Sequence, residues 1–504
     1  MILLKQCTSQ FASSNRESNL SRECSNLTND NNCCEASPVM STLNFAEPII
    51  IVGGGTFGTS TAYHLAQRGY KSVTVLDRWV PPSKDAAGND INKIVRTEYP
   101  QPHYAKLAQD SAAVWKDEKG LFAGLYHQTG WILSVTESTM DFIDGSIQAQ
   151  RRLGLPEAKP VTSQQMRQRW PEMTGNFPGW RPYWNETTAW VDAGGAVKRM
   201  AEAAMTMGVK YISGDQGHAV KLLFDESSQC IGVKCFDGTA HFGSQIIVAA
   251  GAAAAGLLDL KGQIVGKGHT VCHIQLTPEE VKKYTNFPIT SHMEGGESQV
   301  CLFKLLHLSL TSLSTGILFP PQRDGIMKVT ANSFYTNYAP SHPNISVPRY
   351  TSDNPKDGVP RPTIAAIREW MREFVPELAD REFCETKFCW YEKFISTNLM
   401  TFNCTSRTNK VGNRDGDTPD YEFLIAPSPD HKGLKLAVGG SAHGFKFLPV
   451  VGRYVVDMME GHLDPELADK WKWRPGATMN QPTACPLPLV DLNDLPGWKP
   501  AAKL

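Results

Sequence analysis

The chain lacks a net charge of either sign. Its 50 lysines and arginines balance 51 aspartates and glutamates over 504 residues, which leaves a formal charge of −1. Nucleic-acid binding requires a basic surface, so we expect no nucleic-acid partner. The chain also lacks an apolar run that could span a bilayer, because residues 300–319, the nearest candidate, contain Lys304 and His307. We therefore expect no membrane partner.

The 12 cysteines lack any regular spacing. Cys33 and Cys34 are adjacent, and no CxxC pair is present. Scattered cysteines are typical neither of a zinc site nor of a disulfide framework, and they indicate a reducing compartment. We therefore expect no bound metal.

What the sequence does contain is a strand–turn–helix–strand unit at residues 49–77. A strand of buried type, Ile-Ile-Ile-Val, runs into Gly-Gly-Gly-Thr-Phe-Gly at 53–58. Gly53 suits a tight turn, Gly55 allows a pyrophosphate to approach the backbone, and Gly58 allows the helix to pack closely on the sheet. The pattern predicts a dinucleotide site. The alternative is a glycine-rich turn in an ordinary α/β domain.

The end of this unit limits which dinucleotide can bind. The helix N-terminus would face the phosphates, and Asp77, at the end of the second strand, can accept hydrogen bonds from a ribose. An acid at this position disfavours a 2′-phosphate and therefore NADP. Gly69 lies where the expected helix ends, and glycine favours the left-handed conformation found at that position.

The rest of the chain alternates helical and strand-like patterns, which predicts an α/β fold. Helices are expected at 104–116, 163–170, 193–207, 364–374 and 450–460, and strands at 128–135, 209–212, 218–224, 230–236, 244–249 and 316–319. Residues 1–39, rich in Ser, Asn and Cys, are expected to be disordered, and Met40 is a plausible alternative start. A glycine-rich segment returns at 438–447, so the nucleotide domain is expected to be discontinuous. We assign 47–100, 190–265 and 385–463 to it, 101–189 and 266–384 to a substrate domain, and 464–504 to an extended tail.

Several motifs in combination are specific to one family. They are the 53–58 turn, Lys267 ahead of an expected strand, Cys389 ahead of an acidic Pro419-Asp420 turn, and His443-Gly-Phe-Lys446. Together they resemble the fungal fructosyl-amino-acid oxidases, with the monomeric sarcosine, pipecolate and saccharopine oxidases close by in the D-amino-acid-oxidase-like superfamily. The resemblance covers residues 45–475.

The resemblance implies a Rossmann-like FAD-binding domain of the glutathione-reductase type with an inserted α+β substrate domain. It implies FAD held covalently through the sulfur of Cys389; from the residues alone, a buried inert cysteine is the alternative. The cofactor contacts that it implies are Gly53, Gly55, Thr56, Phe57, Gly58, Asp77, Arg78, Lys93, Val220, Cys389, Gly444, Phe445 and Lys446.

The resemblance also implies the catalytic groups. Lys267 matches a lysine beside flavin N5, where a fixed cation would stabilise reduced oxygen. Arg96 and Lys446 match the pair of cations that holds a substrate carboxylate, and Tyr391 matches an aromatic wall of the substrate cage. The alternatives are an exposed strand lysine for Lys267, solvated surface charges for Arg96 and Lys446, and a core tyrosine for Tyr391.

Two departures from the pattern of the fructosyl-amino-acid branch narrow the range of expected substrates. The strand at 316–319 lacks the acid expected in the fructosyl-amino-acid branch, and Tyr421 follows Asp420 where that branch is expected to have arginine. The interpretation is therefore an oxidase that converts a secondary amino acid, similar to sarcosine, pipecolate or saccharopine, to an imine while O2 becomes H2O2. The alternatives are a fructosyl-amino-acid oxidase, a tailoring oxidase for N-methylated amino acids in secondary metabolism, an inactive FAD-binding protein and, more weakly, a nicotinamide dehydrogenase.

Three further features concern the gene and the cell. Residues 300–315 and 392–414 interrupt otherwise matching sequence and are interpreted as intron remnants in the gene model; genuine loops are the alternative. The C-terminal Ala502-Lys503-Leu504 is a variant of the Ser-Lys-Leu address, which predicts binding to the peroxisomal import receptor; a cytoplasmic protein is the alternative. The resemblance implies a monomer.

Overall fold

Strand β1 (Ile49–Val52) is buried along its whole length inside a six-stranded sheet with the order β21-β22-β13-β1-β2-β9. It pairs in parallel with β13 (Gln245–Val248) on one side and β2 (Val73–Leu76) on the other. Uninterrupted apolar strands of this kind are typical of a parallel sheet covered on both faces. The other strands of this sheet are β9 (Lys210–Ile212), β21 (Leu424–Pro427) and β22 (Leu434–Val438).

The computed structural model describes residues 44–293, 316–339, 342–355, 357–394, 422–474 and 490–495. These residues all belong to one compact unit that begins at Asn44. Four of the sequence predictions lie outside the described residues. They concern the expected disorder of 1–39, the interpretation of 300–315 and of most of 392–414 as intron remnants, and the C-terminal tripeptide.

Helix α1 (Thr56–Gln67) packs directly on α10 (Val451–Met459). A Cβ atom at Gly452 would lie 2.1 Å from the Ser60 backbone, and the Ser60 hydroxyl donates to the Leu448 carbonyl at 2.7 Å. This close approach joins the glycine turn near the N-terminus to the 444–459 segment. Gly69, with φ +94°, follows α1 in the left-handed conformation, as predicted.

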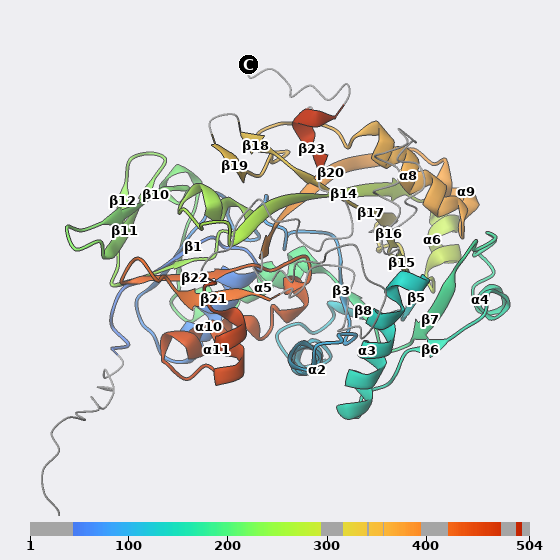
Figure 1. Ribbon diagram of the computed structural model, residues 1–504, viewed down its shortest axis with the longest axis horizontal. Coiled ribbons are helices and arrows are strands. Elements are labelled where there is room, and N and C mark those ends of the chain that lie inside the picture. Colours follow the sequence, from blue (N-terminus) through green and yellow to red (C-terminus); the bar gives the residue numbers. More distant parts are fainter. Residues whose placement is uncertain are drawn as a thin grey trace, which may run out of the picture. The chain divides into compact units, whose positions relative to one another are not determined.

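A second, nine-stranded sheet carries the long strands β14 (Ile264–Gln275) and β20 (Phe383–Phe394), which pair antiparallel (Figure 1). Its other members are β5 (Trp131–Val135), β6 (Lys159–Pro160), β7 (Arg181–Asn185), β15 (Ile289–Met293), β16 (Gly316–Leu318), β17 (Ile326–Thr336) and β23 (Val490–Asp491). Trp370 and Phe374 at the end of α8 (Arg361–Arg372) pack into its core. The division into a cofactor domain and a substrate domain stays a prediction.

The smaller elements complete the described fold. One three-stranded sheet contains β10 (Ala219–Phe224), β11 (Cys230–Cys235) and β12 (Ala240–Phe242); another contains β3 (Lys93–Val95), β8 (Ala189–Val191) and β4 (Tyr126–Gln128); and β18 (Tyr338–Ala339) pairs with β19 (His342–Ser346). The remaining α-helices are α2 (Pro102–Trp115), α3 (Met140–Arg152), α4 (Ser163–Arg169), α5 (Ala193–Thr206), α6 (Pro278–Tyr284), α9 (Pro376–Ala379) and α11 (Pro465–Trp471). Short 3-10 helices are η1 (Glu137–Thr139), η2 (Gly214–Gln216), η3 (Gly251–Gly256), η5 (Gly444–Phe447) and η6 (Leu492–Asp494).

The α/β fold is confirmed, with three local corrections. Lys267 lies inside β14 rather than ahead of a strand, because the apolar pattern continues on both sides of it. Residues 392–394, taken as the start of an insertion, still pair with β14. The tail expected to be extended from residue 464 begins with α11, which Asp464 caps while Leu467 and Trp471 are buried.

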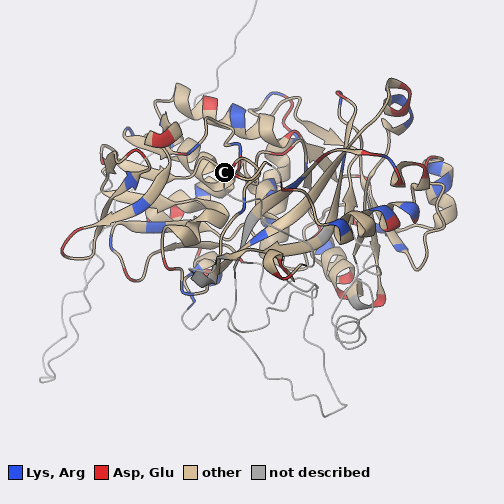
Figure 2. Ribbon diagram, turned by 90° about the horizontal axis from the view of Figure 1, so that it is seen from above, with Lys and Arg blue, Asp and Glu red and all other residues tan. Residues whose placement is uncertain are grey.

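Surface charge does not mark a site on this fold. Lysines, arginines and acids are interspersed over the described ribbon (Figure 2). Within the described residues, no helix has the length and apolar character needed to cross a membrane. The same residues contain no group of three or more His, Cys, Asp or Glu side chains arranged to hold a metal.

Candidate active site

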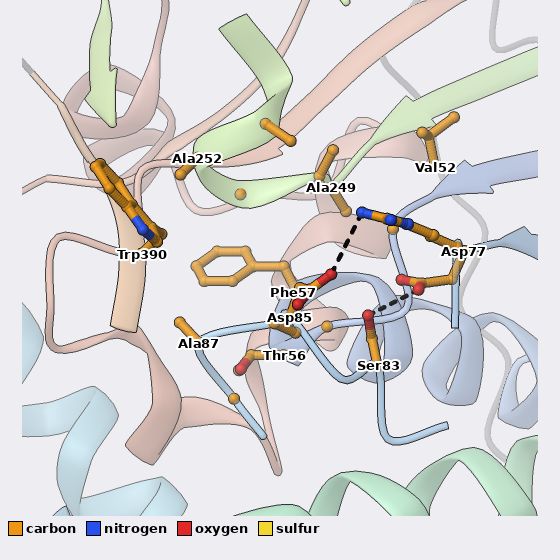
Figure 3. Close-up of a pocket in the computed structure, with 18 of the residues that line it drawn as sticks. Val52, Thr56, Phe57, Asp77, Ser83, Asp85, Ala87, Ala249, Ala252 and Trp390 are labelled. Atoms are coloured by element: carbon orange, nitrogen blue, oxygen red, sulfur yellow. Dashed lines mark hydrogen bonds and ion pairs between the residues drawn. The ribbon is translucent and has the colours of Figure 1, made fainter. Parts of the chain in front are cut away.

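A cavity of about 460 Å³ opens where the parallel strands β1, β2 and β13 end. The carboxyl ends of such strands are where open α/β sheets bind ligands. Figure 3 shows Trp390 and Ala87 at one side of this cavity and Val52 and Asp77 at the other, with Phe57 between them. The lining therefore reaches from the six-stranded sheet to β20 of the nine-stranded sheet.

The glycines of the turn are required for different reasons. Gly53 has φ +105°, and a Cβ atom there would lie 2.6 Å from the Ala249 carbonyl oxygen. A Cβ atom at Gly58 would lie 1.8 Å from the carbonyl oxygen of Gly53, so this glycine lets the helix pack on the turn itself as well as on the sheet. Gly55 lines the cavity, and its nearest neighbour would be the Ala86 methyl at 3.5 Å. Packing within the protein does not require a glycine here, so the missing side chain leaves space for a ligand.

Asp77 is held by three hydrogen bonds. It accepts from the Gly54 backbone at 2.7 Å and from the Trp79 backbone at 2.8 Å. It also accepts from the Ser83 hydroxyl at 2.7 Å, the contact drawn as a dashed line in Figure 3. Burial raises the pKa of Asp77, and these hydrogen bonds oppose that effect. The carboxylate thus stabilises the turn in addition to facing the cavity, a role that the sequence motif did not predict.

A segment that we call the strap, residues 349–353, crosses to the same end of the cavity. Tyr350 lines the cavity, while Asp353 accepts two hydrogen bonds from Arg78, at 2.7 and 2.5 Å. The Ser352 hydroxyl donates to Asp85 at 2.8 Å. Sequence analysis missed the strap because its partners lie more than 250 residues away in the chain.

Asp353→Asn should loosen the strap and speed the loss of a non-covalent cofactor. The side chains of the Arg78–Asp353 pair are 32% and 44% exposed, so we expect only about a two- to five-fold faster dissociation. The measurement is the FAD dissociation rate in a Cys389→Ala background. Asp380→Asn, which removes an exposed pair with Arg372 at the end of α8, is the control. Equal dissociation rates for the two variants would contradict a role of the Arg78–Asp353 pair in retaining the cofactor.

The opposite end of the cavity carries reactive groups. Cys389 lies in β20, directly opposite His269 of β14, and the Lys93 ammonium lies 3.7 Å from its sulfur. Both Cys389 and Lys93 line the cavity, as do Gly444 and Phe445 of η5. Burial, and next the charge of Lys93, lower the pKa of His269 to about 4, so this imidazole is neutral near pH 7.

Lys267 is buried, at 1% exposure, and does not line this cavity. It lies two residues before His269 in β14, so the two side chains project from the same face of the strand. Its backbone partner in β20 is Tyr391. The structure thus brings Lys267 and Tyr391 together in register with the His269–Cys389 pair, and it excludes the alternative of an exposed lysine.

Arg96 and Lys446 meet on the ring of Tyr99. The Lys446 ammonium donates to the Tyr99 hydroxyl at 2.8 Å and to the His443 carbonyl at 2.9 Å, and the Arg96 guanidinium carbon lies 4.5 Å from the ring centroid. Lys446 is 3% exposed, and burial followed by the charge of Arg96 lowers its pKa well below the usual range. The Arg96 Nη1 is buried without a hydrogen-bond partner among the described residues. A cation of this kind suits an incoming carboxylate.

The predicted cofactor residues thus fall into two groups. Those that line the cavity are Gly53, Gly55, Thr56, Phe57, Asp77, Arg78, Lys93, Val220, Cys389, Gly444 and Phe445. Gly58 and Lys446 do not line it. Lining residues that sequence analysis missed include Trp79, Ser83, His269, Tyr350 and Trp390. Trp390 was next to a motif residue, whereas His269 and Tyr350 carried no signal of their own.

Comparisons with known proteins agree with a flavin site. The family model for FAD dependent oxidoreductases matches residues 48–458. The chain is 29% identical to the L-saccharopine oxidase of Schizosaccharomyces pombe over 84% of this chain and 93% of that protein. It is 21% identical to a monomeric sarcosine oxidase of Bacillus over 80% and 90% of the two chains. The crystal structure of the fructosamine oxidase Amadoriase II of Aspergillus fumigatus superposes with a TM-score of 0.75 at 29% identity, covering 91% of this chain and 98% of that one.

Proposed function

Because this chain belongs to the family of FAD-dependent oxidoreductases, we propose that it is a flavoprotein oxidase for secondary amino acids. The observation that carries the proposal is the similarity to L-saccharopine oxidase along 84% of the chain. The reaction oxidises the C–N bond of the amino acid to an imine, and O2 is reduced to H2O2. A substrate of the saccharopine class fits best, since sarcosine oxidases share less sequence with this chain.

The residues of the cavity suit the cofactor. Asp77 and the amide groups of the glycine turn would hold the adenosine and pyrophosphate part, and the space in front of Gly55 admits it. Lys93, Cys389, Gly444 and the neighbouring Phe445 would surround the ring system. When bound, FAD supplies the two-electron acceptor that takes a hydride equivalent from the substrate and passes the electrons to O2.

The chain's own groups would position the substrate. Arg96 and Lys446 would bind its carboxylate, which fixes the neighbouring carbon and nitrogen relative to the cavity. Tyr99 holds Lys446 in place by accepting its hydrogen bond. Lys267 would provide a fixed positive charge where oxygen is reduced. Tyr391, which pairs with Lys267 through the backbone, would form part of the substrate wall.

A peroxide assay of the purified full chain tests the proposal. Saccharopine, pipecolate, sarcosine and fructosyl-valine are offered in parallel, and we expect the highest kcat/KM with saccharopine. Turnover of fructosyl-valine alone would favour the second candidate, a fructosyl-amino-acid oxidase, which the similarity to Amadoriase II supports. If the chain binds flavin but yields peroxide with none of the four amines, both candidate functions are contradicted.

Covalent attachment of FAD through Cys389 is part of the proposal. The position of this sulfur on the cavity wall, beside the Lys93 ammonium, supports it. After acid precipitation the yellow colour should remain in the pellet of the wild-type chain and move to the supernatant for Cys389→Ala. Colour in the wild-type supernatant would contradict the attachment.

We also propose peroxisomal import through the C-terminal Ala502-Lys503-Leu504, a monomeric state, and the two-domain division given above. A fluorescent protein fused to the N-terminus, with the natural C-terminus free, should enter peroxisomes; a cytosolic signal would contradict import. Transcript sequencing across 300–315 and 392–414 tests whether these segments are translated.

A further inference from the structure

A buried charge cluster lies behind the wall of the cavity that Cys389 lines. Lys328 of β17 is 2% exposed, and its ammonium donates to Asp90 at 2.8 Å and to the Asn92 carbonyl. The Lys93 ammonium contacts the same Asp90 oxygen at 2.8 Å and points another donor at the Cys389 sulfur, 3.7 Å away. One carboxylate oxygen is thus shared by two lysines, one of which contacts the thiol.

The charges in this cluster do not balance when Cys389 is a thiol. Burial opposes ionisation, yet the charges of Lys328 and Lys93 hold the pKa of Asp90 well below its usual range, so Asp90 is an anion. Asp90 in turn raises the pKa of Lys93 despite its burial. Burial lowers the pKa of Lys328 to about 8, which still leaves it mostly protonated at pH 7. Two cations and one anion remain, with one positive charge in excess.

No other described group in contact with the cluster supplies the missing negative charge. His269, on the adjacent strand, has a pKa lowered to about 4 and is neutral near pH 7. Phe319 places its ring 4.5 Å from the Lys328 ammonium and offers only a weak cation–π contact. The Lys93 side chain is 23% exposed and faces the cavity, so its charge is only partly desolvated, and an anion beside it is favoured. Ionisation of Cys389 would bring the cluster to neutrality.

We propose that Lys328 and Asp90 are positioning residues that prepare Cys389 for covalent attachment to the flavin. Lys328 supplies the second cation, and the excess positive charge beside the Cys389 sulfur would stabilise the thiolate that attacks the flavin. Asp90 holds both ammonium groups and aims Lys93 at the sulfur. The inference rests on the proposed flavin linkage, and it deepens that proposal by assigning residues outside the cavity lining to it.

The Cys389 sulfur gives up its proton, and its electron pair forms a C–S bond to the methyl carbon on the isoalloxazine ring. That carbon loses a C–H proton, and the electron pair of the broken C–H bond passes into the ring, which is thereby reduced by two electrons. O2 takes up these two electrons with two protons as H2O2. The cation at Lys93 favours the first of these events, because the attacking group is the thiolate.

The experiment follows the covalent fraction with time after FAD is added to the full chain purified without flavin. In Lys328→Met, Asp90 balances Lys93 alone and no excess positive charge stabilises the attacking sulfur, so we expect attachment to slow about ten-fold or more. In the double variant Lys328→Met/Asp90→Asn, the amide oxygen that replaces the carboxylate can still accept from Lys93 and keep it beside the sulfur. The excess positive charge returns, so the rate should recover. Lys328→Arg keeps the charge and should behave like wild type. Lys387→Met is the matched control, because this lysine lies in β20 with Cys389 but outside the cluster.

A second readout does not depend on flavin. Alkylation of Cys389 by iodoacetamide at pH 7, measured by peptide mass spectrometry in the flavin-free chain, should slow in Lys328→Met and recover in the double variant. Equal rates in wild type and Lys328→Met would overturn the inference, as would a double variant as slow as Lys328→Met. If Lys328→Met does not fold, failure of Lys328→Arg to match wild type overturns it. Wild-type chain that never retains flavin contradicts the linkage instead, while the alkylation rates still test the charge balance.

Discussion

Lys446→Met should lower kcat/KM for amino-acid substrates by about 100-fold or more. The Lys446 ammonium is buried between the Tyr99 hydroxyl and the His443 carbonyl, and it lies on the same aromatic ring as the guanidinium of Arg96. Methionine keeps the shape of the side chain but removes the charge that a substrate carboxylate would meet. The measurement is the rate of flavin reduction against substrate concentration without oxygen.

The control separates loss of carboxylate binding from loss of structure. Lys435→Met removes a partly buried lysine on β22 and should leave kcat/KM nearly unchanged. An amine without a carboxylate should react equally slowly with wild type and Lys446→Met. If Lys446→Met slowed both kinds of amine alike, the assignment of Lys446 to the carboxylate would be wrong.

The same lysine predicts how KM depends on pH. Burial, followed by the charge of Arg96, lowers the pKa of Lys446 well below its usual range. A bound carboxylate favours the protonated lysine, so above the lowered pKa substrate binding must take up a proton. KM should therefore rise as pH increases through and above that pKa, and buffers of different ionisation enthalpy should reveal the proton uptake by calorimetry. In Lys446→Met this dependence should disappear.

Gly58→Ala should prevent stable folding, with a loss of about 3 kcal/mol or more. The new methyl group would lie 1.8 Å from the Gly53 carbonyl oxygen and 3.2 Å from Ile51. Neither neighbour can move, because Gly53 is fixed between β1 and the Ala249 backbone and Ile51 is fully buried in the sheet. Thermal unfolding of the flavin-free chain measures the effect.

Two neighbouring glycines provide matched controls. In Gly54→Ala the methyl group would meet its nearest atom, an Asp77 oxygen, at an ordinary 3.4 Å, so stability should change little. Gly55→Ala should also fold, since its methyl group meets only Ala86 at 3.5 Å, but it should weaken FAD binding because the methyl group enters the cavity. Equal melting temperatures for the Gly58 and Gly54 variants would contradict the packing role of Gly58.

The nucleotide half of the site could be predicted because its signal is local. Gly53, Gly55 and Asp77 belong to one strand–turn–helix–strand unit, and each residue type follows from backbone geometry or ligand charge within that unit. The flavin half was reached only by resemblance. Cys389 and Lys93 lie almost 300 residues apart in the chain and carry no periodic pattern that relates them. Nothing in the sequence marked Lys328 or Asp90, because charged residues are expected to be exposed.

Hydrophobic periodicity and glycine conformation act between neighbours in the chain, so the α/β fold and the dinucleotide turn follow from local sequence. The burial of Lys267, Lys328 and Lys446 depends on long-range packing and could not be predicted from local sequence. The fold also pairs Asp353 of the strap with Arg78 and places Cys389 beside Lys93, which shares Asp90 with Lys328. The burial and the contacts of Lys267 and Lys328 depend on how the fold places β20, β14 and β17 side by side. These strands are far apart in the sequence, which carries no local pattern that relates them.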